Sequence, residues 1–482
     1  MSEQQFDVVI LGGGTGGYVA AIRAAQLGLN VAVVEKDKVG GTCLHRGCIP
    51  SKALLKSAEA LASTQKFKDF GITLNGEVSL NFGTVMERKG KIINNLHKGV
   101  QSLLKKNNVT IFEGTGRVMG PSIFSPTAGA VSLERANGET EIISPRNVII
   151  ATGSRPKSLP GLTTDGKFVI NSDHALELEE LPKSIIIVGA GAIGVEWASM
   201  FSDFGVEVTL VEYAPQILPL EDEDAAAEVA KLLGRRKAKV KIMTSTGVIA
   251  DTFKIDGETV SIDAKVNVGT DKEAIQTLTA DKILVSVGRE ACIDGIGLEA
   301  TEVQVDRGTI VVDENYRTKE QNIFAIGDVI NTPQLAHVAS HEGIHAVEVI
   351  AGHKPHPINY PMIPRCIYSR PEVASVGYTE SQMRKEGREI KVGKFPFRGI
   401  GKAQVNGDID GFVKIIADAK TGDVLGVHMV GAHVTEMISE ASLAAVLDAT
   451  AWEIGMTIHP HPTLAEAIGE AALAVDGQAI HF

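Results

Sequence analysis

The sequence predicts an α/β protein with two Rossmann-like dinucleotide-binding domains, a central domain and a C-terminal α+β domain. Three observations support this prediction: a unit of strand, glycine-rich turn and helix occurs twice, the chain is long, and a run of prolines marks a late boundary. At 482 residues the chain exceeds what one hydrophobic core usually supports. We therefore expect four domains, at residues 1–150, 151–280, 281–350 and 351–482.

The duplicated unit covers residues 6–35 and 184–212, which align without a gap. In each copy the first glycine allows a tight turn, the second lets the backbone approach a pyrophosphate, and the third packs the helix on the strand. Each copy is therefore predicted to bind a dinucleotide, the weaker alternative being two turns without a ligand. The glycines are Gly12, Gly14 and Gly17 in the first copy and Gly189, Gly191 and Gly194 in the second.

A glutamate ends the second strand of each copy. Glu35 and Glu212 are predicted to accept hydrogen bonds from ribose hydroxyls. A carboxylate at Glu212 would repel a 2′-phosphate, and residues 212–228 contain no Lys or Arg that could bind one. The second site is therefore predicted to use NAD and not NADP.

The segments between the two copies and directly after them supply further elements. Residues 85–106 are predicted to form a helix, residues 109–150 short strands with an Asn-Gly turn, and residues 238–290 strands again. Two strands around a polar turn are expected within residues 309–330, before a helix that ends near Gly352.

The last segment follows four prolines between residues 355 and 364. It is predicted to contain two strands, GFVKIIAD and VLGVHMVG, that are joined by a turn. An amphipathic helix should then place one apolar face on the core, formed by Val434, Met437, Ile438 and Ala441.

Composition and charge exclude several classes of protein. The net charge is −12 and no long Lys/Arg run occurs, so binding to nucleic acid or to an anionic membrane is not expected. No signal-like segment and no apolar run of 18 residues is present, which predicts a cytoplasmic protein. Four cysteines in so long a chain do not form a disulfide framework, so any cysteine pair in it is predicted to be catalytic.

Cys43 and Cys48 are five positions apart. A regular helix would separate their Cα atoms by about 7.5 Å along its axis, beyond the roughly 7 Å limit for a disulfide, so we expect a distortion at Gly47. The spacing leaves open buried thiols, half of a metal site or a redox disulfide. No second Cys or His pair stands nearby at ligand spacing, so no metal is predicted. Cys292 and Cys366 are expected to be ordinary buried thiols.

Further motifs occur in a fixed order: GGTCLHRGCIPSK at residues 40–52, ATGSRP at 151–156, AIGDV at 325–329 and HPHPTLAE at 459–466. Together with the two glycine fingerprints they resemble the pyridine nucleotide-disulfide oxidoreductases across essentially the whole chain. The resemblance implies a homodimer formed through the C-terminal domain, with one non-covalent FAD per subunit and NAD+/NADH as the second nucleotide. One departure is His45-Arg46, where many members of the family carry an uncharged pair.

The resemblance implies a role for each of six site residues. Cys43 is similar to the thiol that meets the substrate, and Cys48 to the thiol beside the flavin ring. Oxidation of a dithiol releases two protons while NAD+ accepts a hydride, so a base is required, and histidine suits this task. His461 and Glu466 resemble that base and its orienting carboxylate, although Thr463 to Glu466 also fits a capping box. The two remaining residues, Lys52 and Glu196, resemble an ion pair near the flavin.

The resemblance also implies the residues that bind each cofactor. Those implied for FAD are Gly12, Gly14, Gly17, Glu35, Lys52, Gly153, Asp328 and Ala336, with Asp328 holding the ribityl chain. Those implied for NAD are Gly189, Gly191, Gly194, Glu212 and Gly288.

The reaction implied by the resemblance is oxidation of protein-bound dihydrolipoamide to lipoamide with reduction of NAD+ to NADH. The implied partners are the lipoyl and subunit-binding domains of the acyltransferase in a 2-oxo acid dehydrogenase complex, or the H-type carrier of glycine cleavage. The alternatives are another NAD(P)-dependent disulfide reductase and a non-catalytic scaffold. Glu212 opposes the NADP-dependent glutathione reductases, the final GQAIHF lacks the cysteine pair of mercuric reductases, and a scaffold should lack a thiol pair or a base.

Overall fold

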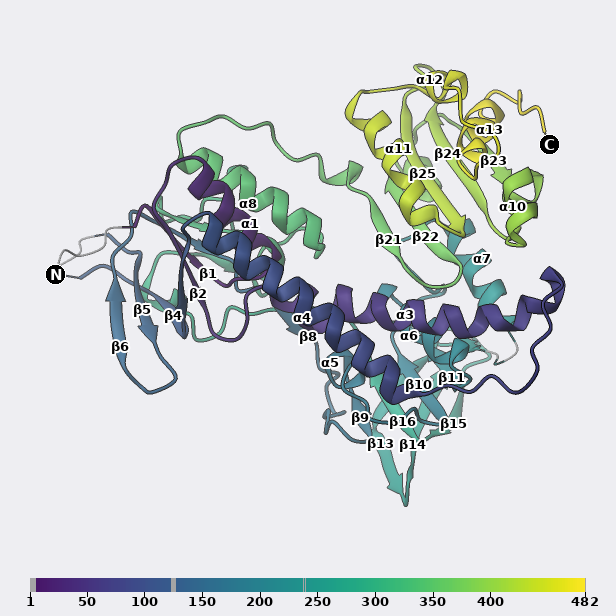
Figure 1. Cartoon of the computed structure of the whole chain (residues 1–482), viewed down its shortest axis with the longest axis horizontal. Coiled ribbons are helices and arrows are strands. Elements are labelled where there is room, and N and C mark those ends of the chain that lie inside the picture. Colours follow the sequence, from purple (N-terminus) through teal and green to yellow (C-terminus); the bar gives the residue numbers. More distant parts are fainter. Residues whose placement is uncertain (1–5, 123–126, 237, 239, 482) are drawn as a thin grey trace. The chain divides into compact units, whose positions relative to one another are not determined.

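The computed structural model describes residues 6–122, 127–236, 238 and 240–481. Its internal contacts divide the chain into two compact units, each assembled from three segments. The first unit comprises Met1–Ala53, Thr84–Lys157 and Arg289–Tyr360, and the second comprises Leu54–Gly83, Ser158–Gly288 and Pro361–Phe482. Figure 1 colours these segments along the chain.

The first unit is built on a five-stranded sheet in which all neighbouring strands run parallel. Most residues of its central strands are buried aliphatic side chains, as expected when a parallel sheet is covered on both faces. In spatial order the strands are β20 (Ile323–Ala325), β7 (Asn147–Ile150), β1 (Val8–Leu11), β2 (Val31–Glu35) and β3 (Thr110–Glu113).

Two helices from distant parts of the sequence pack side by side in this unit, α1 (Thr15–Gln26) and α8 (Ala336–Ile350). Glycines allow the close approach: a Cβ on Gly16 would lie 3.1 Å from the carbonyl oxygen of Ala339, and a Cβ on Gly343 only 2.8 Å from that of Gly16. The segment after residue 289 therefore completes the first unit.

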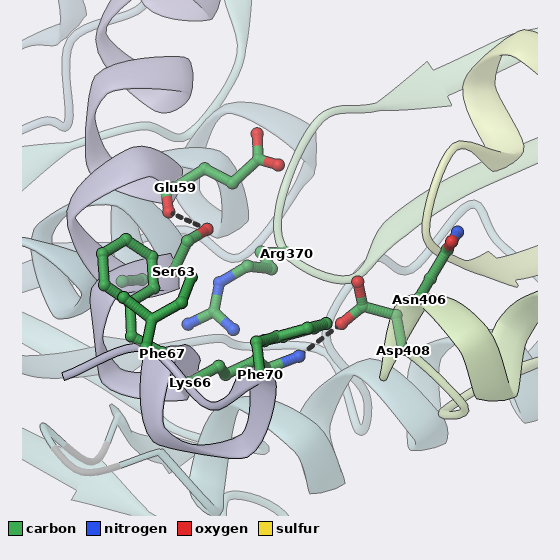
Figure 2. A pocket seen from close by; sticks show the side chains of 10 residues that line it. Glu59, Ser63, Lys66, Phe67, Phe70, Arg370, Asn406 and Asp408 are labelled. Atoms are coloured by element: carbon green, nitrogen blue, oxygen red, sulfur yellow. Dashed lines mark hydrogen bonds and ion pairs between the residues drawn. The ribbon is translucent and has the colours of Figure 1, made fainter.

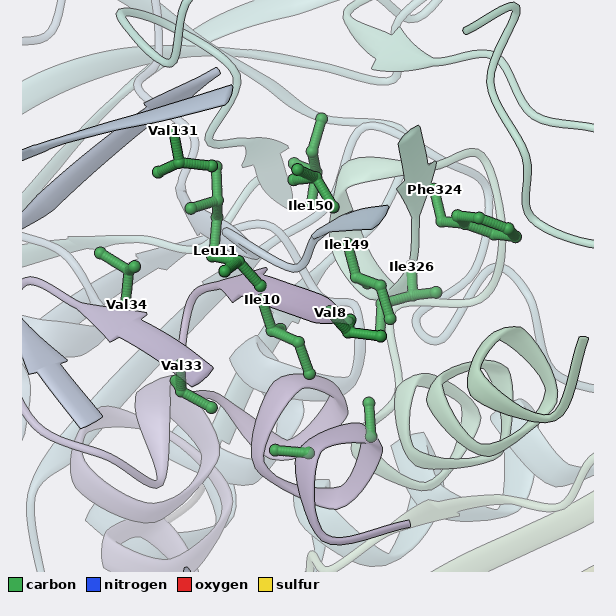
Figure 3. Packing of buried hydrophobic residues seen from close by; sticks show 14 of the residues in the cluster. Val8, Ile10, Leu11, Val33, Val34, Val131, Ile149, Ile150, Phe324 and Ile326 are labelled. Carbon is green, nitrogen blue, oxygen red and sulfur yellow. The ribbon is translucent and has the colours of Figure 1, made fainter. Parts of the chain in front are cut away.

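Side chains alternate between the two faces of this sheet, as the pleat of a strand requires. Ile10 and Val33 point toward the helices, whereas Leu11 and Val34 point to the opposite face with Val131 (Figure 3). Val131 belongs to an antiparallel sheet of β4 (Thr115–Met119), β5 (Ala130–Glu134) and β6 (Thr140–Ile143). The core of the unit thus lies on both faces of the parallel sheet.

The second compact unit contains a second parallel sheet of five strands. Its strands, in spatial order, are β12 (Val240–Met243), β11 (Glu207–Val211), β10 (Ser184–Val188), β16 (Lys282–Val285) and β9 (Val169–Ile170). An antiparallel sheet of β13 (Gly247–Asp256), β14 (Thr259–Val266) and β15 (Ala274–Ala280) joins its core, and the helices are α5 (Ser172–Ala175), α6 (Ala192–Asp203) and α7 (Glu223–Gly234). The two central repeat strands, β10 and β11, have neighbours in their parallel sheet that are equivalent to those of β1 and β2 in the first.

The same unit holds a five-stranded antiparallel sheet near the C-terminus. In spatial order its strands are β21 (Arg365–Ile367), β22 (Glu372–Gly377), β25 (Val424–Gly431), β24 (Phe412–Asp418) and β23 (Ile390–Pro396). Its helices are α9 (Glu380–Lys385), α10 (Gly401–Asn406), α11 (Val434–Val446), α12 (Ala451–Met456) and α13 (Glu466–Ala474).

The remaining elements are short or connect these layers. The helices are α2 (Gly41–Arg46), α3 (Cys48–Ser63), α4 (Phe82–Lys106) and the 3₁₀ turns η1 (Thr64–Phe70), η2 (Leu298–Ala300), η3 (Gly327–Val329), η4 (Tyr360–Met362) and η5 (Phe397–Gly399). The strands are β8 (Ser154–Pro156), β17 (Arg289–Ala291), β18 (Val305–Asp306) and β19 (Thr309–Ile310).

Most predicted elements are confirmed. The predicted helix at 85–106 is α4, the helix predicted to end near Gly352 is α8, and the predicted apolar face of α11 packs on the C-terminal core. The two strands expected within residues 309–330 exist but do not pair with each other. Strand β19 pairs with β18. Strand β20, whose three residues are all buried, joins the parallel sheet beside β7.

Within the described residues, no helix is long and apolar enough to cross a membrane. The division of the chain into four domains at the predicted boundaries stays a prediction.

Candidate active site and nucleotide sites

The two glycine-rich turns have the same geometry at matching positions. Gly12 and Gly189 lie in the left-handed region, with φ of 102° and 98°. A Cβ on either residue would lie only 2.3 Å or 2.5 Å from a carbonyl oxygen in the loop after the adjacent strand. A Cβ on Gly17 or Gly194 would lie 1.9 Å from the carbonyl oxygen of the first glycine. No other residue type fits at these four positions.

The second glycine of each turn precedes a helix. Gly14 and Gly191 are the N-cap residues of α1 and α6, and neither helix has a side-chain cap or an acidic residue in its first turn. The space outside Gly191 is open, with no atom within 4 Å of a Cβ built there, whereas a Cβ on Gly14 would be in ordinary contact with the Cα of Gly41 at 3.9 Å. Backbone N–H groups at an uncapped helix start fit a pyrophosphate, so the residues present fit a dinucleotide at each turn.

The two strand-end glutamates are held in the same way. Glu35 accepts hydrogen bonds from the backbone N–H groups of Gly13 at 2.7 Å and Asp37 at 2.8 Å. Glu212 repeats both bonds at matching positions, at 2.7 Å and 2.8 Å. Each carboxylate oxygen keeps a further lone pair for another donor. The predicted contact with ribose hydroxyls stays a prediction, now for two carboxylates whose orientation the backbone fixes.

Gly47 interrupts the helical segment that carries the cysteine pair. Cys43 lies on α2, which ends at Arg46, and Cys48 is the first residue of α3. The backbone of Gly47 is not helical, with φ −148° and ψ −112°, and a Cβ there would lie 3.0 Å from the carbonyl oxygen of Thr42. The predicted distortion at Gly47 is therefore confirmed. It removes the regular helical rise that would hold the two thiols apart.

The two thiols interact directly. The pKa of the Cys43 thiol is raised, first by a side-chain hydrogen bond with Cys48 and then by burial. A hydrogen bond from Thr15 and the charge of Lys52 act in the opposite direction and lower this pKa. The hydrogen bond with Cys48 and burial therefore outweigh Thr15 and Lys52 and favour the protonated form of the Cys43 thiol.

Asp328 lies in η3, in the first unit. Ser154 donates a hydrogen bond to its carboxylate, and Arg289 in turn donates to Ser154 Oγ at 2.8 Å. Directly before it, the N–H group of Gly327 donates to Glu342 Oε2 at 2.6 Å. Glu342 on α8 is fully buried, and burial raises the pKa of its carboxyl group. Glu342 was not among the predicted site residues, although a charge on the apolar stripe of a predicted helix was a signal for it.

His461 and Glu466 form a direct pair. Nδ1 of His461 lies 2.9 Å from Glu466 Oε1, and Glu466 Oε2 accepts the N–H of Thr463 at 2.9 Å. Burial alone would raise the pKa of the Glu466 carboxyl group, but the hydrogen bonds from His461 and Thr463 bring it below its ordinary value. The carboxylate half of the predicted capping box is confirmed, because Glu466 accepts the N–H of Thr463. The other half is wrong, because Thr463 Oγ1 donates to the carbonyl oxygen of Pro460 and α13 begins only at Glu466. Glu466 thus both orients the imidazole and holds the loop.

The other predicted site residues are placed as follows. Lys52 lies on α3 in the first unit, whereas Glu196 lies buried on α6 in the second and accepts the N–H of Tyr368 at 3.0 Å. Their predicted ion pair stays a prediction. The remaining three, which stay predicted cofactor contacts, are Gly153 before β8, Gly288 before β17 and Ala336 at the start of α8.

A cavity of about 370 Å³ in the second unit contains none of the predicted site residues. Figure 2 shows Arg370 extending between the side chains of η1 and the loop at Asp408. Both cations that line the cavity are paired: Arg370 with Asp203, at 3.1 Å from Nε, and Lys66 with Asp408. This pairing disfavours the cavity as a nucleotide phosphate site.

In the part of the chain that the structure describes, no three His, Cys, Asp or Glu side chains are grouped so that they could hold a metal ion. Cys292 and Cys366 are half-buried, and burial raises the pKa of the Cys292 thiol.

Known family models and curated proteins match nearly the whole chain. Residues 6–343 match the family model of the pyridine nucleotide-disulphide oxidoreductases, and residues 363–472 match the model of the dimerisation domain of that family. The chain is 58% identical over 479 residues to a dihydrolipoyl dehydrogenase of Bacillus subtilis, covering 99% of both chains. It is 44% identical to the dihydrolipoyl dehydrogenase of Zymomonas mobilis, again over 99% of both.

Solved structures share the fold. LpdA from Mycobacterium tuberculosis superposes with a TM-score of 0.87 at 26% identity, over 96% of this chain and 98% of that one. RclA, an HOCl-induced flavoprotein disulfide reductase from Escherichia coli, gives a TM-score of 0.84 at 26% identity, over 97% and 99%. The resemblance carried by the sequence motifs and the predicted fold class are both confirmed.

Proposed function

Because the chain belongs to the pyridine nucleotide-disulphide oxidoreductase family, we propose that it acts as a dihydrolipoyl dehydrogenase, oxidising dihydrolipoamide to lipoamide and reducing NAD+ to NADH. The family is flavin-dependent and uses NAD(H) as a substrate. The observation that carries the proposal is the interacting thiol pair on a broken helix, in the same unit as a glycine-rich turn that fits a dinucleotide.

The cysteine pair accepts electrons from the substrate. A substrate thiolate attacks the sulfur of Cys43 in the Cys43–Cys48 disulfide, so a mixed disulfide forms and Cys48 leaves as a thiolate. The second substrate thiol then attacks the substrate sulfur of the mixed disulfide and releases Cys43. The products are a substrate disulfide and a reduced pair in which the proton resides on Cys43, consistent with the raised pKa of that thiol.

The proposed base is His461 of the partner subunit. Residues 363–472 of this chain, which include His461, match the dimerisation domain of the family, so this histidine would lie at the contact between two subunits. The exposed imidazole, with 76% of its side chain accessible, takes the proton of the substrate thiol while Glu466 fixes the ring through Nδ1. The free Nε2 is the atom that takes up the proton.

The two glycine-rich turns are the proposed nucleotide sites. The turn at Gly12 and Gly14, with Asp328 and Lys52, would hold FAD, and the turn at Gly189 and Gly191 would hold NAD. When bound, FAD supplies a ring that accepts the electron pair of the dithiol and passes it as a hydride to NAD+. The contribution of the chain is to bind both nucleotides, to position the thiols and to move the proton.

The proposed partners are proteins that carry a lipoyl group. They are the lipoyl and subunit-binding domains of a 2-oxo acid dehydrogenase acyltransferase, or the H-type carrier of glycine cleavage. A redox-active cysteine pair suits a reducing compartment, so we propose a cytoplasmic location.

An initial-rate assay with two dithiol sources and two nucleotides tests this function. We expect NAD+ reduction by free dihydrolipoamide to exceed that by reduced glutathione by a factor on the order of 10³, because a paired dithiol completes the exchange within one molecule. NADP+ should be reduced at least about a hundredfold less efficiently than NAD+, since Glu212 carries a charge that repels a 2′-phosphate. Equal rates with glutathione would contradict the substrate assignment, and equal efficiency with NADP+ would contradict the role of Glu212.

A further inference from the structure

The helix that carries Cys43 has little stability of its own. It has only six residues, and its N-cap, Gly40, provides no side-chain hydrogen bond. Isolated helices of this length do not persist in water, so contacts with neighbouring elements must fix its position. Those contacts then determine where the Cys43 thiol lies.

Two histidines meet on one carbonyl group beside this helix. Nε2 of His45, which lies between the two cysteines, is 3.0 Å from the carbonyl oxygen of Val39. Nδ1 of His97 on α4 is also 3.0 Å from that oxygen. The rings stand edge to face with centroids 5.0 Å apart. A carbonyl oxygen has two lone pairs, so the two imidazoles use both of them.

The other side of the Val39 segment is bonded to the first glycine-rich turn. The N–H group of Gly40 donates to the carbonyl oxygen of Gly13 at 2.8 Å. A Cβ on Gly41 would lie 2.5 Å from the Cα of Gly14, so the two backbones are in contact there. Residues 39–41 therefore connect the nucleotide turn on one side with two histidines on the other.

The geometry also fixes which nitrogen of each ring carries a hydrogen. A carbonyl oxygen only accepts, so His45 must donate from Nε2 and His97 must donate from Nδ1. The charged side chains that act on the His45 ring are Lys38, which lowers its pKa, and Asp37, which raises it and is paired with Arg46. Burial lowers the pKa of His45, which favours a neutral donor.

We propose that His45, together with His97, is a positioning residue for the redox pair: the two imidazoles hold the Val39–Gly41 turn, and that turn sets α2 so that Cys43 keeps its hydrogen bond with Thr15 and stays within the field of the Lys52 charge. Thr15 is the first residue of α1, directly after Gly14, so a shift of residues 39–41 against Gly14 shifts Cys43 against Thr15. The hydrogen bond with Thr15 and the charge of Lys52 are the two influences that stabilise the Cys43 thiolate. The inference rests on the proposed redox function of the pair.

The two different donor atoms give a selective test by substitution. The amide nitrogen of Gln matches the position of Nε2 in His, and that of Asn matches Nδ1. We therefore expect His45→Gln and His97→Asn to behave as the unsubstituted protein. His45→Asn, His45→Leu, His97→Gln and His97→Leu should lose the bond to Val39. His353→Leu, at an exposed histidine of the same unit, is the matched control.

The measurement is the rate of alkylation of Cys43 by iodoacetamide in the dithiol-reduced holoenzyme across a pH series, with the labelled residue identified by mass spectrometry. In the four variants that lose the bond, the rate at neutral pH should fall about tenfold, as a thiol pKa higher by about one unit produces. A holoenzyme that keeps its flavin in each variant shows that the fold is intact.

The outcomes separate the inference from the function on which it rests. Unchanged alkylation in His45→Leu, or equal behaviour of His45→Gln and His45→Asn, would overturn the positioning role. If the unsubstituted protein released no pair of thiols on dithiol treatment, the proposed function would be contradicted, and the inference that rests on it as well.

Discussion

Replacing Cys48 with serine is expected to lower dihydrolipoamide oxidation by a factor on the order of 10³ or more, while the protein stays folded and retains its flavin. Serine is nearly isosteric with cysteine but cannot form a disulfide, so electrons have no covalent route from the substrate. The structure gives the thiol a direct partner, since Cys48 hydrogen-bonds Cys43. NADH formation from free dihydrolipoamide, measured at saturating substrate, reports the loss.

The matched control is Cys292→Ser. Cys292 is also half-buried, and burial raises the pKa of its thiol, as expected for an unreactive cysteine. This variant should keep turnover within about twofold of the unsubstituted enzyme. Comparable losses in both variants, or turnover by Cys48→Ser above about a tenth of the original rate, would contradict the assigned pair.

Replacing His461 with glutamine is expected to lower dithiol oxidation by roughly 10²-fold to 10⁴-fold, the range that a positioned general base contributes. Glutamine keeps the polarity and approximate size of the side chain, and 76% of the His461 side chain is exposed, so folding and flavin binding should be unaffected. Because the flavin site needs no proton from this residue, NADH-dependent reduction of a one-electron dye should remain near normal. Stopped-flow reduction by dihydrolipoamide measures the affected half-reaction directly.

His481→Gln provides a closely matched control. Its Nδ1 lies 2.7 Å from Glu470, and 68% of the side chain is exposed, so it forms the same kind of imidazole–carboxylate pair in the same unit. Its loss should leave turnover unchanged. A His461→Gln enzyme with near-normal dithiol oxidation, or an equal defect in His481→Gln, would refute the base assignment.

Local sequence signals predicted the two repeats of strand, glycine-rich turn and helix in detail. The helices α1 (Thr15–Gln26) and α6 (Ala192–Asp203) begin and end at positions that the gapless alignment equates, and the two glutamates make matching hydrogen bonds. Each feature depends on residues within about thirty positions of one another. A glycine-rich turn of this kind adopts one backbone geometry, so contacts with distant segments have little influence on its structure.

Features that depend on distant segments were predicted less well. The strand β20 has three residues, too few for a periodic pattern, and only its burial beside β7 explains why it joins the parallel sheet. The buried contact of Glu342 with Gly327 crosses from α8 to η3 and depends on how α8 packs. The predicted start of α13 was wrong because Thr463 Oγ1 donates to the carbonyl oxygen of Pro460 instead of capping the helix, which begins at Glu466.

The site residues fall into the same two groups. Gly47 could be expected from the geometry of two thiols five positions apart, whereas the histidine pair on Val39 could not, because His97 lies on a helix that begins 34 positions after Cys48. Motif resemblance supplied the residues that are predicted to form the site. It did not indicate which contacts hold them in place.

Anaerobic titration of the purified protein with dihydrolipoamide, followed by absorbance and by thiol alkylation at each step, tests the redox role of the cysteine pair most directly. The account predicts that about one equivalent per flavin gives a long-wavelength absorption band and makes two new thiols reactive, which mass spectrometry assigns to Cys43 and Cys48. A flavin that is bleached with no such band and no new reactive thiols at these two positions would contradict it.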